Sequence, residues 1–281
     1  MPDLELSRRD ALAALAAAGG YALAAEPVLA QAIKTDSQGI VTGTVDVAGA
    51  DGTPIPVYEA RPDKAGTFPV VVVISEVWGV HEWIKDVTRR FAKEGYYAIA
   101  PELFSREGGL AQVTDMDKIR SVVFNAPLKR IMGDLRASAD YARKQPTAQG
   151  DHLGVTGFCW GGGVTLLFSA AYKDTKAAVP WYGAITRALK DDPKPVAPLD
   201  VAAEIPCPVL MLYSGIDQGI PVADVEKMEA ALKAAGRTVE KVIYPDAPHG
   251  FLADYRPTYR PEAAKDGWAR CLAWFQKYLK A

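Results

Sequence analysis

One cysteine of the chain lies in a pattern that is typical of an enzymatic nucleophile. It is the central residue of Gly157-Phe158-Cys159-Trp160-Gly161. This spacing predicts a sharp turn from a strand into a helix, with cysteine in the place that serine often takes. Glycines are needed on both sides because side chains there would clash, and the start of a helix favours the thiolate form. The pattern therefore predicts a nucleophilic Cys159; the alternative is a buried cysteine in a glycine-rich turn.

A general base is expected among the three histidines. His249 follows the predicted strand at residues 239–244 and precedes the last predicted helix, so it would lie at a strand end. His152 precedes a strand, and we expect it at the opposite edge of the sheet. His81 lies on another loop and is expected to line the site at most. The order of the elements therefore favours His249 as the base.

The acid that orients this base should lie between nucleophile and base along the chain. Asp217 is the first candidate, because it ends the segment Ser214-Gly215-Ile216-Asp217, which directly follows the predicted strand at residues 208–213. Asp224 falls in the first turn of a predicted helix, where acids are common because of the helix dipole. Asp246 lies only three residues before His249. We expect Asp217 to be the acid, with the other two as alternatives.

These three residue types in this order predict acyl transfer. Cys159 would attack a carbonyl carbon, His249 would transfer protons, and Asp217 would orient the imidazole. The oxyanion would accept hydrogen bonds from the backbone N–H of Trp160 and of a residue after an early strand, with Val77 as the leading candidate. A thioester intermediate suits activated esters and lactones better than peptides. A ligand-binding protein on a hydrolase fold and a redox-sensing thiol protein are the alternatives.

Apolar runs predict the elements that would bring these residues together. Residues 40–47 and 55–60 are expected to form a β-hairpin, and the continuously apolar residues 68–74 a strand buried on both faces. Further strands are expected at 96–100, 153–158, 177–182, 208–213 and 239–244, and helices at 84–94, 127–144, 162–172, 222–235 and 261–279. This order predicts an α/β fold with a mostly parallel central sheet, helices on both faces and an N-terminal β-hairpin. In such sheets the active groups gather at the carboxyl ends of the strands.

The composition of the chain limits the classes of ligand and partner that the protein is expected to bind. The chain of 281 residues has 32 Lys+Arg and 34 Asp+Glu, a formal charge of −2, and 49% hydrophobic residues. A near-neutral balance without a long basic run argues against nucleic acid. Three cysteines without a CxxC pair argue against a disulfide framework or structural zinc. We expect a monomeric enzyme with a small-molecule substrate, no metal, no nucleic acid and no membrane partner once an export signal has been removed.

Residues 1–32 are expected to be that signal. Arg8 and Arg9 precede an apolar stretch rich in Ala and Leu, and residues 30–32 form an A-x-A pattern. The adjacent arginines resemble a twin-arginine signal. The alternative is an amphipathic helix that packs on the domain. We expect cleavage near Ala32, a single domain over residues 33–281 and a periplasmic location, or a cytoplasmic one if the signal does not function.

Four motifs together resemble the dienelactone hydrolase (carboxymethylenebutenolidase) family of the α/β-hydrolase superfamily. They are Gly157-Phe158-Cys159-Trp160-Gly161-Gly162, Ser214-Gly215-Ile216-Asp217, Pro248-His249-Gly250-Phe251 and Ser75-Glu76-Val77-Trp78-Gly79. The resemblance extends from about Val41 to the C-terminus. It implies an α/β-hydrolase fold, hydrolysis of small lactones or esters such as dienelactone, and no metal or organic cofactor.

The resemblance also implies roles for two charged residues. Glu76 would hydrogen-bond the resting thiol and help to deprotonate it when substrate binds. Arg106 would bind a substrate carboxylate. The family's second arginine for that carboxylate, four residues after the catalytic histidine, is Ala253 here, and Arg256 lies three residues further on. The natural substrate can therefore differ from dienelactone.

Aromatic residues near the predicted strand ends indicate an apolar pocket. Trp78 and Phe251 are the candidates for contacts with the substrate, and Trp160, Trp181 and Tyr182 lie at neighbouring strand ends. The proline-containing residues 183–205 are expected at the rim of this pocket.

Overall fold

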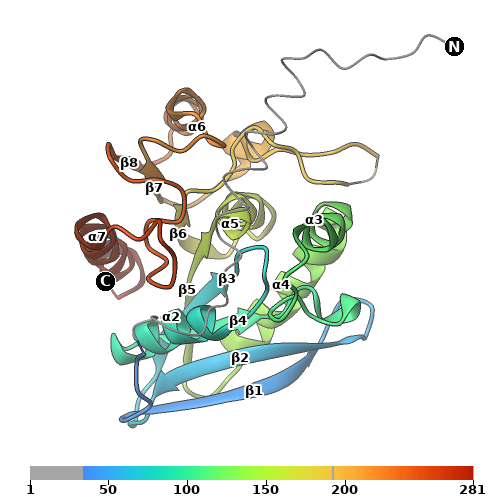
Figure 1. Cartoon of the computed structure of the whole chain (residues 1–281). Coiled ribbons are helices and arrows are strands. Elements are labelled where there is room, and N and C mark those ends of the chain that lie inside the picture. Colours follow the sequence, from blue (N-terminus) through green and yellow to red (C-terminus); the bar gives the residue numbers. More distant parts are fainter. Residues whose placement is uncertain (1–33, 192, 281) are drawn as a thin grey trace, which may run out of the picture.

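A computed structural model describes residues 34–191 and 193–280 of the chain. In this part of the chain eight strands form one sheet: β1 (Ile40–Ala48), β2 (Pro54–Pro62), β3 (Phe68–Ile74), β4 (Tyr97–Pro101), β5 (Ala148–Phe158), β6 (Thr175–Trp181), β7 (Val209–Ser214) and β8 (Val239–Tyr244). Their order in the sheet is β1-β2-β4-β3-β5-β6-β7-β8 (Figure 1). β2 pairs antiparallel with β1 and with β4, and all other neighbouring strands are parallel. The predicted hairpin and the mostly parallel sheet are confirmed.

Burial follows the position of each strand in the sheet. β3 has the sequence FPVVVVI and is buried along its whole length, because it lies between β4 and β5 and helices cover both of its faces. β1 lies at the edge, and from Thr42 onward exposed residues alternate with half-buried or buried ones. The turn between β1 and β2 includes Gly52, whose φ of 80° is a conformation that favours glycine.

Helices cover both faces of the sheet (Figure 1). They are α2 (Glu82–Lys93), α3 (Met116–Asn125), α4 (Leu128–Arg143), α5 (Trp160–Ala171), α6 (Val222–Ala234) and α7 (Pro261–Leu279), with 3₁₀ turns η1 (Ser105–Glu107) and η2 (Pro198–Glu204). Two glycines of β5 identify the faces. A Cβ on Gly154 would lie 2.7 Å from Leu279 of α7, and one on Gly157 would lie 2.6 Å from Thr165 of α5. Residues three apart in a strand point to opposite sides, so α7 and α5 cover opposite faces.

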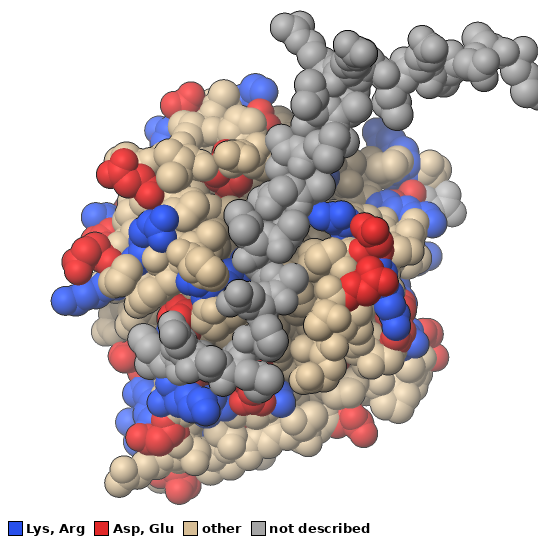
Figure 2. Space-filling model, in the orientation of Figure 1, with Lys and Arg blue, Asp and Glu red and all other residues tan. Residues whose placement is uncertain are grey.

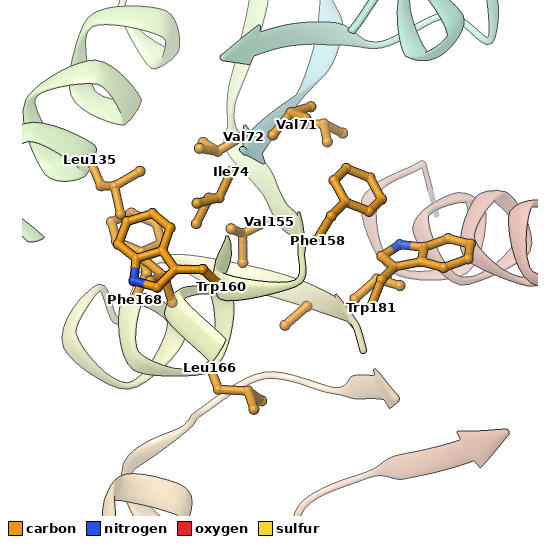
Figure 3. Close-up of a cluster of buried hydrophobic side chains, with 14 of the residues drawn as sticks. Val71, Val72, Ile74, Leu135, Val155, Phe158, Trp160, Leu166, Phe168 and Trp181 are labelled. Atoms are coloured by element: carbon orange, nitrogen blue, oxygen red, sulfur yellow. The ribbon is translucent and has the colours of Figure 1, made fainter. Parts of the chain in front are cut away.

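The core continues on both sides of the turn after β5. Figure 3 shows Phe158 pointing toward Trp181, while Trp160 lies on the other side, near Leu135 and Phe168. The ring centroids of Phe158 and Trp181 are 5.9 Å apart. The turn between β5 and α5 is therefore held by packing on both faces of the sheet.

Two features of the helices differ from the sequence prediction. α3 was not expected; it begins after Asp115, whose side chain accepts hydrogen bonds from two amides of the first turn. For α7, the sequence predicts one apolar face with Trp268, Leu272, Phe275 and Leu279; Phe275 and Leu279 are fully buried, whereas Trp268 and Leu272 are only half-buried. The helix also approaches the sheet at Gly267, where a Cβ would lie 2.7 Å from the ring of Trp181.

Charges of both signs are interspersed on the face seen in Figure 2. Among the residues that the structure describes, no helix combines the length and the apolar character that crossing a bilayer requires. The predicted export signal at residues 1–32 lies outside the described residues.

Candidate active site

Cys159 occupies a strained turn between β5 and α5. Its φ is 56° and its ψ is −119°, an uncommon conformation for a residue other than glycine. A Cβ on Gly157 would lie 2.3 Å from the carbonyl oxygen of Gly161, and a Cβ on Gly161 would lie 2.3 Å from that of Ser75. Both glycines are therefore sterically required, which is the reason for the Gly-x-Cys-x-Gly spacing. The backbone N–H of Cys159 donates to the carbonyl oxygen of Trp181, 3.1 Å away, and anchors the turn to β6.

The thiol lies at an apolar pocket. Cys159 is 1% exposed. The pocket has an empty volume of about 380 Å³, open solvent at its mouth included, and it is lined by Phe124, Cys159, Trp160, Gly163, Leu167, Ala184, Arg187, Leu189, Pro198 and Ile220. Four of these residues belong to the segment 183–205, so the expectation that this segment borders the pocket is confirmed.

The imidazole of His249 has a partner at each side. Its Nδ1 lies 2.6 Å from Oδ2 of Asp217. Burial disfavours the charged imidazolium, but the charge and hydrogen bond of Cys159 and those of Asp217 outweigh burial and raise the pKa of His249 to about 10. The ring of Tyr182 packs edge-on against the imidazole, with centroids 5.2 Å apart. The structure thus brings His249 together with both of its predicted partners.

Asp217 is fixed by its own loop. Its Oδ1 accepts hydrogen bonds from the backbone N–H groups of Gly219, at 2.8 Å, and Ile220, at 3.2 Å. Its side chain is 4% exposed. The other two candidates lie elsewhere: Asp224 bonds Thr186 and Lys227, and Asp246 is exposed.

Parallel neighbouring strands explain why Asp217 and His249 meet. β7 and β8 are adjacent and parallel, so the loops after them leave the same edge of the sheet. The hydroxyl of Ser214, at the end of β7, donates to the carbonyl oxygen of Pro248, 2.9 Å away. This bond fixes the loop that carries His249.

Two backbone amides are suited to bind an oxyanion. Trp160 is the first residue of α5, where the N–H groups have no acceptor within the helix. The N–H of Val77 has no acceptor among the described residues. Glu102 fixes the loop after Val77, because its carboxylate accepts from the N–H of Val80 at 2.7 Å and leaves no room for a Cβ on Gly79.

Glu76 lies in a buried cluster of polar residues. Its Oε2 is 2.7 Å from Nη2 of Arg256, accepts a hydrogen bond from the hydroxyl of Tyr255 at 2.7 Å, and is 3.7 Å from Nε2 of His81. Burial opposes ionisation, but Arg256 and then His81 outweigh it and lower the pKa of Glu76 to about 2. The carboxylate therefore stays ionised, and in this arrangement Arg256 balances its charge.

Arg106 has both of its strong partners away from this cluster. Its guanidinium forms ion pairs with Asp134, at 2.5 Å, and with Asp51, at 2.8 Å. The side chain of Asp134 is 1% exposed, so Arg106 neutralises a buried carboxylate. The expectation that Arg106 binds a substrate carboxylate stays a prediction, and this pairing does not favour it.

Arg256 is the charged residue of the site that sequence analysis left unassigned. Its guanidinium lies 4.6 Å from the ring centroid of Trp78, and the residue is 7% exposed. The turns after His249 fold it back onto Glu76, a contact across 180 residues that no local pattern indicates. Trp78 packs on Arg256, and Phe251 is fully buried between Trp181 and Tyr244. Neither of these two predicted substrate-binding residues lines the pocket that contains Cys159.

No group of His, Cys, Asp and Glu side chains suited to hold a metal ion occurs among the residues described.

Comparisons with known proteins identify the family of the chain. A profile of the dienelactone hydrolase family matches residues 55–279. A protein named "Putative carboxymethylenebutenolidase" from Methylorubrum extorquens is 48% identical over 277 residues, which cover 97% of this chain and 94% of that protein. One of the same name from Escherichia coli is 43% identical over 263 residues, or 92% of this chain and 95% of that protein.

A solved structure is similar over most of its length. The crystal structure titled as a putative dienelactone hydrolase from Klebsiella pneumoniae has a TM-score of 0.80 and 43% identity, and the match covers 85% of this chain and 99% of that chain. The predicted α/β-hydrolase fold is thereby confirmed. The chain belongs to the dienelactone hydrolase family and is a hydrolase of lactones or esters.

Proposed function

We propose that the chain hydrolyses small activated esters or lactones through Cys159, His249 and Asp217, with a thioester intermediate. The observation that carries this proposal is the position of one imidazole: His249 is bonded to Asp217 at 2.6 Å and interacts with the Cys159 thiol. The raised pKa of His249 favours a charged imidazolium, and an imidazolium next to sulfur is the arrangement that stabilises the nucleophilic thiolate in cysteine hydrolases.

The reaction would proceed in two halves. Sulfur of Cys159 attacks the carbonyl carbon, and the oxyanion accepts hydrogen bonds from the amides of Trp160 and Val77. The C–O bond to the leaving group breaks as His249 donates its proton to the departing oxygen. Water then attacks the thioester while His249 accepts a proton, the C–S bond breaks, and the carboxylic acid leaves with the thiolate restored.

Arg256 supports this chemistry by balancing Glu76. An isolated carboxylate near the thiol would disfavour a thiolate through repulsion between like charges. The positive charge of Arg256, 2.7 Å from Glu76, opposes that repulsion. We propose that Glu76 changes partner between Arg256 and the thiol during turnover; the family resemblance implies its contact with the thiol, and the structure gives its pairing with Arg256.

The experiment that tests the mechanism replaces the sulfur. Cys159→Ala should abolish hydrolysis of 4-nitrophenyl acetate, and wild-type enzyme quenched during turnover should carry one acetyl group on Cys159 in a mass spectrum. Cys207→Ala is the matched control, because Cys207 is also a buried free cysteine but lies before β7. Turnover retained by Cys159→Ala would refute this mechanism. No turnover of esters, lactones or thioesters by the wild type would favour a ligand-binding role.

We also propose that residues 1–32 direct export to the periplasm. The paired arginines and the A-x-A pattern support this proposal. Cell fractionation should find the processed protein in the periplasm, and the double change Arg8→Lys, Arg9→Lys should retain it in the cytoplasm. Periplasmic protein at an unchanged level in the variant would exclude the twin-arginine route.

A further inference from the structure

We infer that Arg187 recognises a carboxylate on the acyl part of the substrate, in the same pocket that contains the Cys159 thiol. This inference rests on the proposed function and adds a residue that determines its specificity. The substrates that Arg187 would favour are esters and lactones in which a short apolar segment separates the scissile carbonyl from an anionic group on the acyl side.

The pocket is built from segments that are far apart along the chain. α5 contributes the wall beside Cys159, the segment between β6 and β7 contributes Arg187 and Leu189, and α3 contributes Phe124. In Figure 1 the segment after β6 runs beside α3, and the N–H of Leu128 donates to the carbonyl oxygen of Lys190 at 2.8 Å. The backbone that carries Arg187 is thereby tied to the start of α4.

Arg187 is the one charged side chain in this lining, because the other residues apart from Cys159 are apolar or glycine. It is half-buried, and its guanidinium lies 5.9 Å from the ring centroid of Phe124. An aromatic face attracts a cation but leaves the N–H groups at the guanidinium edge able to donate. Arg187 is therefore held at the pocket wall with its donors available.

The charge of Arg187 is uncompensated in the part of the chain that the structure describes. No carboxylate oxygen of residues 34–191 and 193–280 lies within 4.0 Å of its guanidinium nitrogens, whereas Arg106 and Arg256 each pair with a buried carboxylate. A further anion at Arg106 or Arg256 would have to displace that carboxylate. An anion that binds at Arg187 would displace no carboxylate of the described residues.

The chemistry of the guanidinium and of the pocket lining indicates which anionic group Arg187 would bind. The guanidinium fork matches the two oxygens of a carboxylate, and an apolar lining strengthens such a pair because it excludes water. The carbonyl under attack must lie at Cys159, so the carboxylate and the carbonyl belong to one molecule and are joined through the apolar part of the pocket. The pair supplies binding and orientation, and Arg187 is a specificity-determining residue that takes no part in proton transfer.

The experiment compares matched esters. The anionic probes are the 4-nitrophenyl monoesters of succinic, glutaric and adipic acid; the neutral probes are 4-nitrophenyl butyrate, valerate and hexanoate, with the same chain lengths. The best anionic probe should exceed its neutral match in kcat/KM. Arg187→Gln should lower kcat/KM for that probe about 10- to 100-fold, the size expected of a charge-assisted hydrogen-bonded pair, mainly through KM. The neutral probes should change less than about 3-fold, and Arg187→Lys should retain part of the preference.

Arg136→Gln is the control variant. Arg136 is an exposed arginine whose guanidinium also lies over an aromatic ring, 5.3 Å from the centroid of Tyr172, but it is on α4 and does not line the pocket. This variant should keep the wild-type preference. Equal loss for anionic and neutral probes in Arg187→Gln, or no preference in the wild type, would overturn the inference while hydrolysis itself persists. Absence of hydrolysis of every probe by the wild type would instead refute the proposed function, and the inference with it.

Discussion

Replacement of Asp217 by Asn tests the proposed mechanism most directly, because the change keeps the shape of the side chain and removes its charge. Oδ1 of Asp217 already accepts from the amides of Gly219 and Ile220, so the amide oxygen of Asp217→Asn would remain on that side. Its NH₂ group would then face Nδ1 of His249, 2.6 Å away in the wild type. Two donors cannot bond each other, so His249 would have to turn or carry its proton on Nε2, where it can no longer accept the proton of the thiol.

The charge of Asp217 is one of the interactions that raise the pKa of His249. A pKa of about 10 against an ordinary value of about 6.5 corresponds to on the order of 5 kcal/mol in favour of the imidazolium. Burial opposes this form, and the interactions with Cys159 and then with Asp217 outweigh burial. Loss of the carboxylate should lower this pKa by at least about one unit. With the unfavourable tautomer added, we expect kcat/KM to fall by about 10²- to 10⁴-fold.

The assay is kcat/KM for 4-nitrophenyl acetate between pH 5 and 10.5. Wild-type activity should persist to about pH 10 and fall above it, because a group whose pKa is raised loses its proton only as the pH rises through the higher value. In Asp217→Asn the alkaline limb should move to lower pH. Asp224→Asn, which removes an acid bonded to Thr186 and Lys227, should leave both the rate and the limb unchanged. A loss below 3-fold in Asp217→Asn, or an alkaline limb that does not move, would refute the reasoning.

Three further changes test the surroundings of the site. Glu76→Gln leaves the Arg256 guanidinium buried without a counter-charge and should lower the free energy of unfolding by about 3–5 kcal/mol. Because the pKa of Glu76 is lowered to about 2, the stability that its charge contributes is present above about pH 4.5 and is lost as the pH falls through 2. The free energy of unfolding should therefore depend less on pH in this acidic range in the variant than in the wild type. Arg106→Gln should lower the free energy of unfolding by up to a similar amount, because the buried carboxylate of Asp134 would lose its ion-pair partner and keep only the more distant charge of Arg130. Its effects on kcat/KM should be equal for anionic and neutral esters, and a loss confined to anionic esters would instead place Arg106 in substrate binding. Gly161→Ala forces a Cβ to within 2.3 Å of a backbone oxygen and should cost at least ~2 kcal/mol of stability and most of the activity, and a thermal unfolding curve like that of the wild type would contradict the steric argument.

The sequence predicts the parts of this site that depend on local rules and on sheet topology. The Gly-x-Cys-x-Gly spacing is a steric requirement within five residues, and the structure has the corresponding backbone conformation at Cys159. The meeting of Asp217 and His249 follows from two adjacent parallel strands that end at the same edge. Both predictions need only the order of the elements.

Contacts that depend on the path of a loop escape this kind of reasoning. The residues after His249 form successive turns that carry Arg256 back to Glu76, and no periodicity marks that path. The predicted face of α7 holds for Phe275 and Leu279, but Trp268 and Leu272 are only half-buried, and the close approach to the sheet at Gly267 was not predicted. The helix α3 could have been predicted, because Asp115 is a typical N-cap residue and Ile119 and Val123 are spaced for one face of the helix that follows it.

The strained turn at position 159 has a consequence for the evolution of this scaffold. Its shape is imposed by Gly157, by Gly161 and by the anchoring of the backbone to β6, and sulfur itself takes no part in it. Exchange of the thiol for a hydroxyl therefore demands no rearrangement of the main chain, and cysteine and serine codons differ by a single base. A lineage built on this frame can pass between thioester and oxygen-ester chemistry in one mutational step, and selection then acts on the charges around the nucleophile.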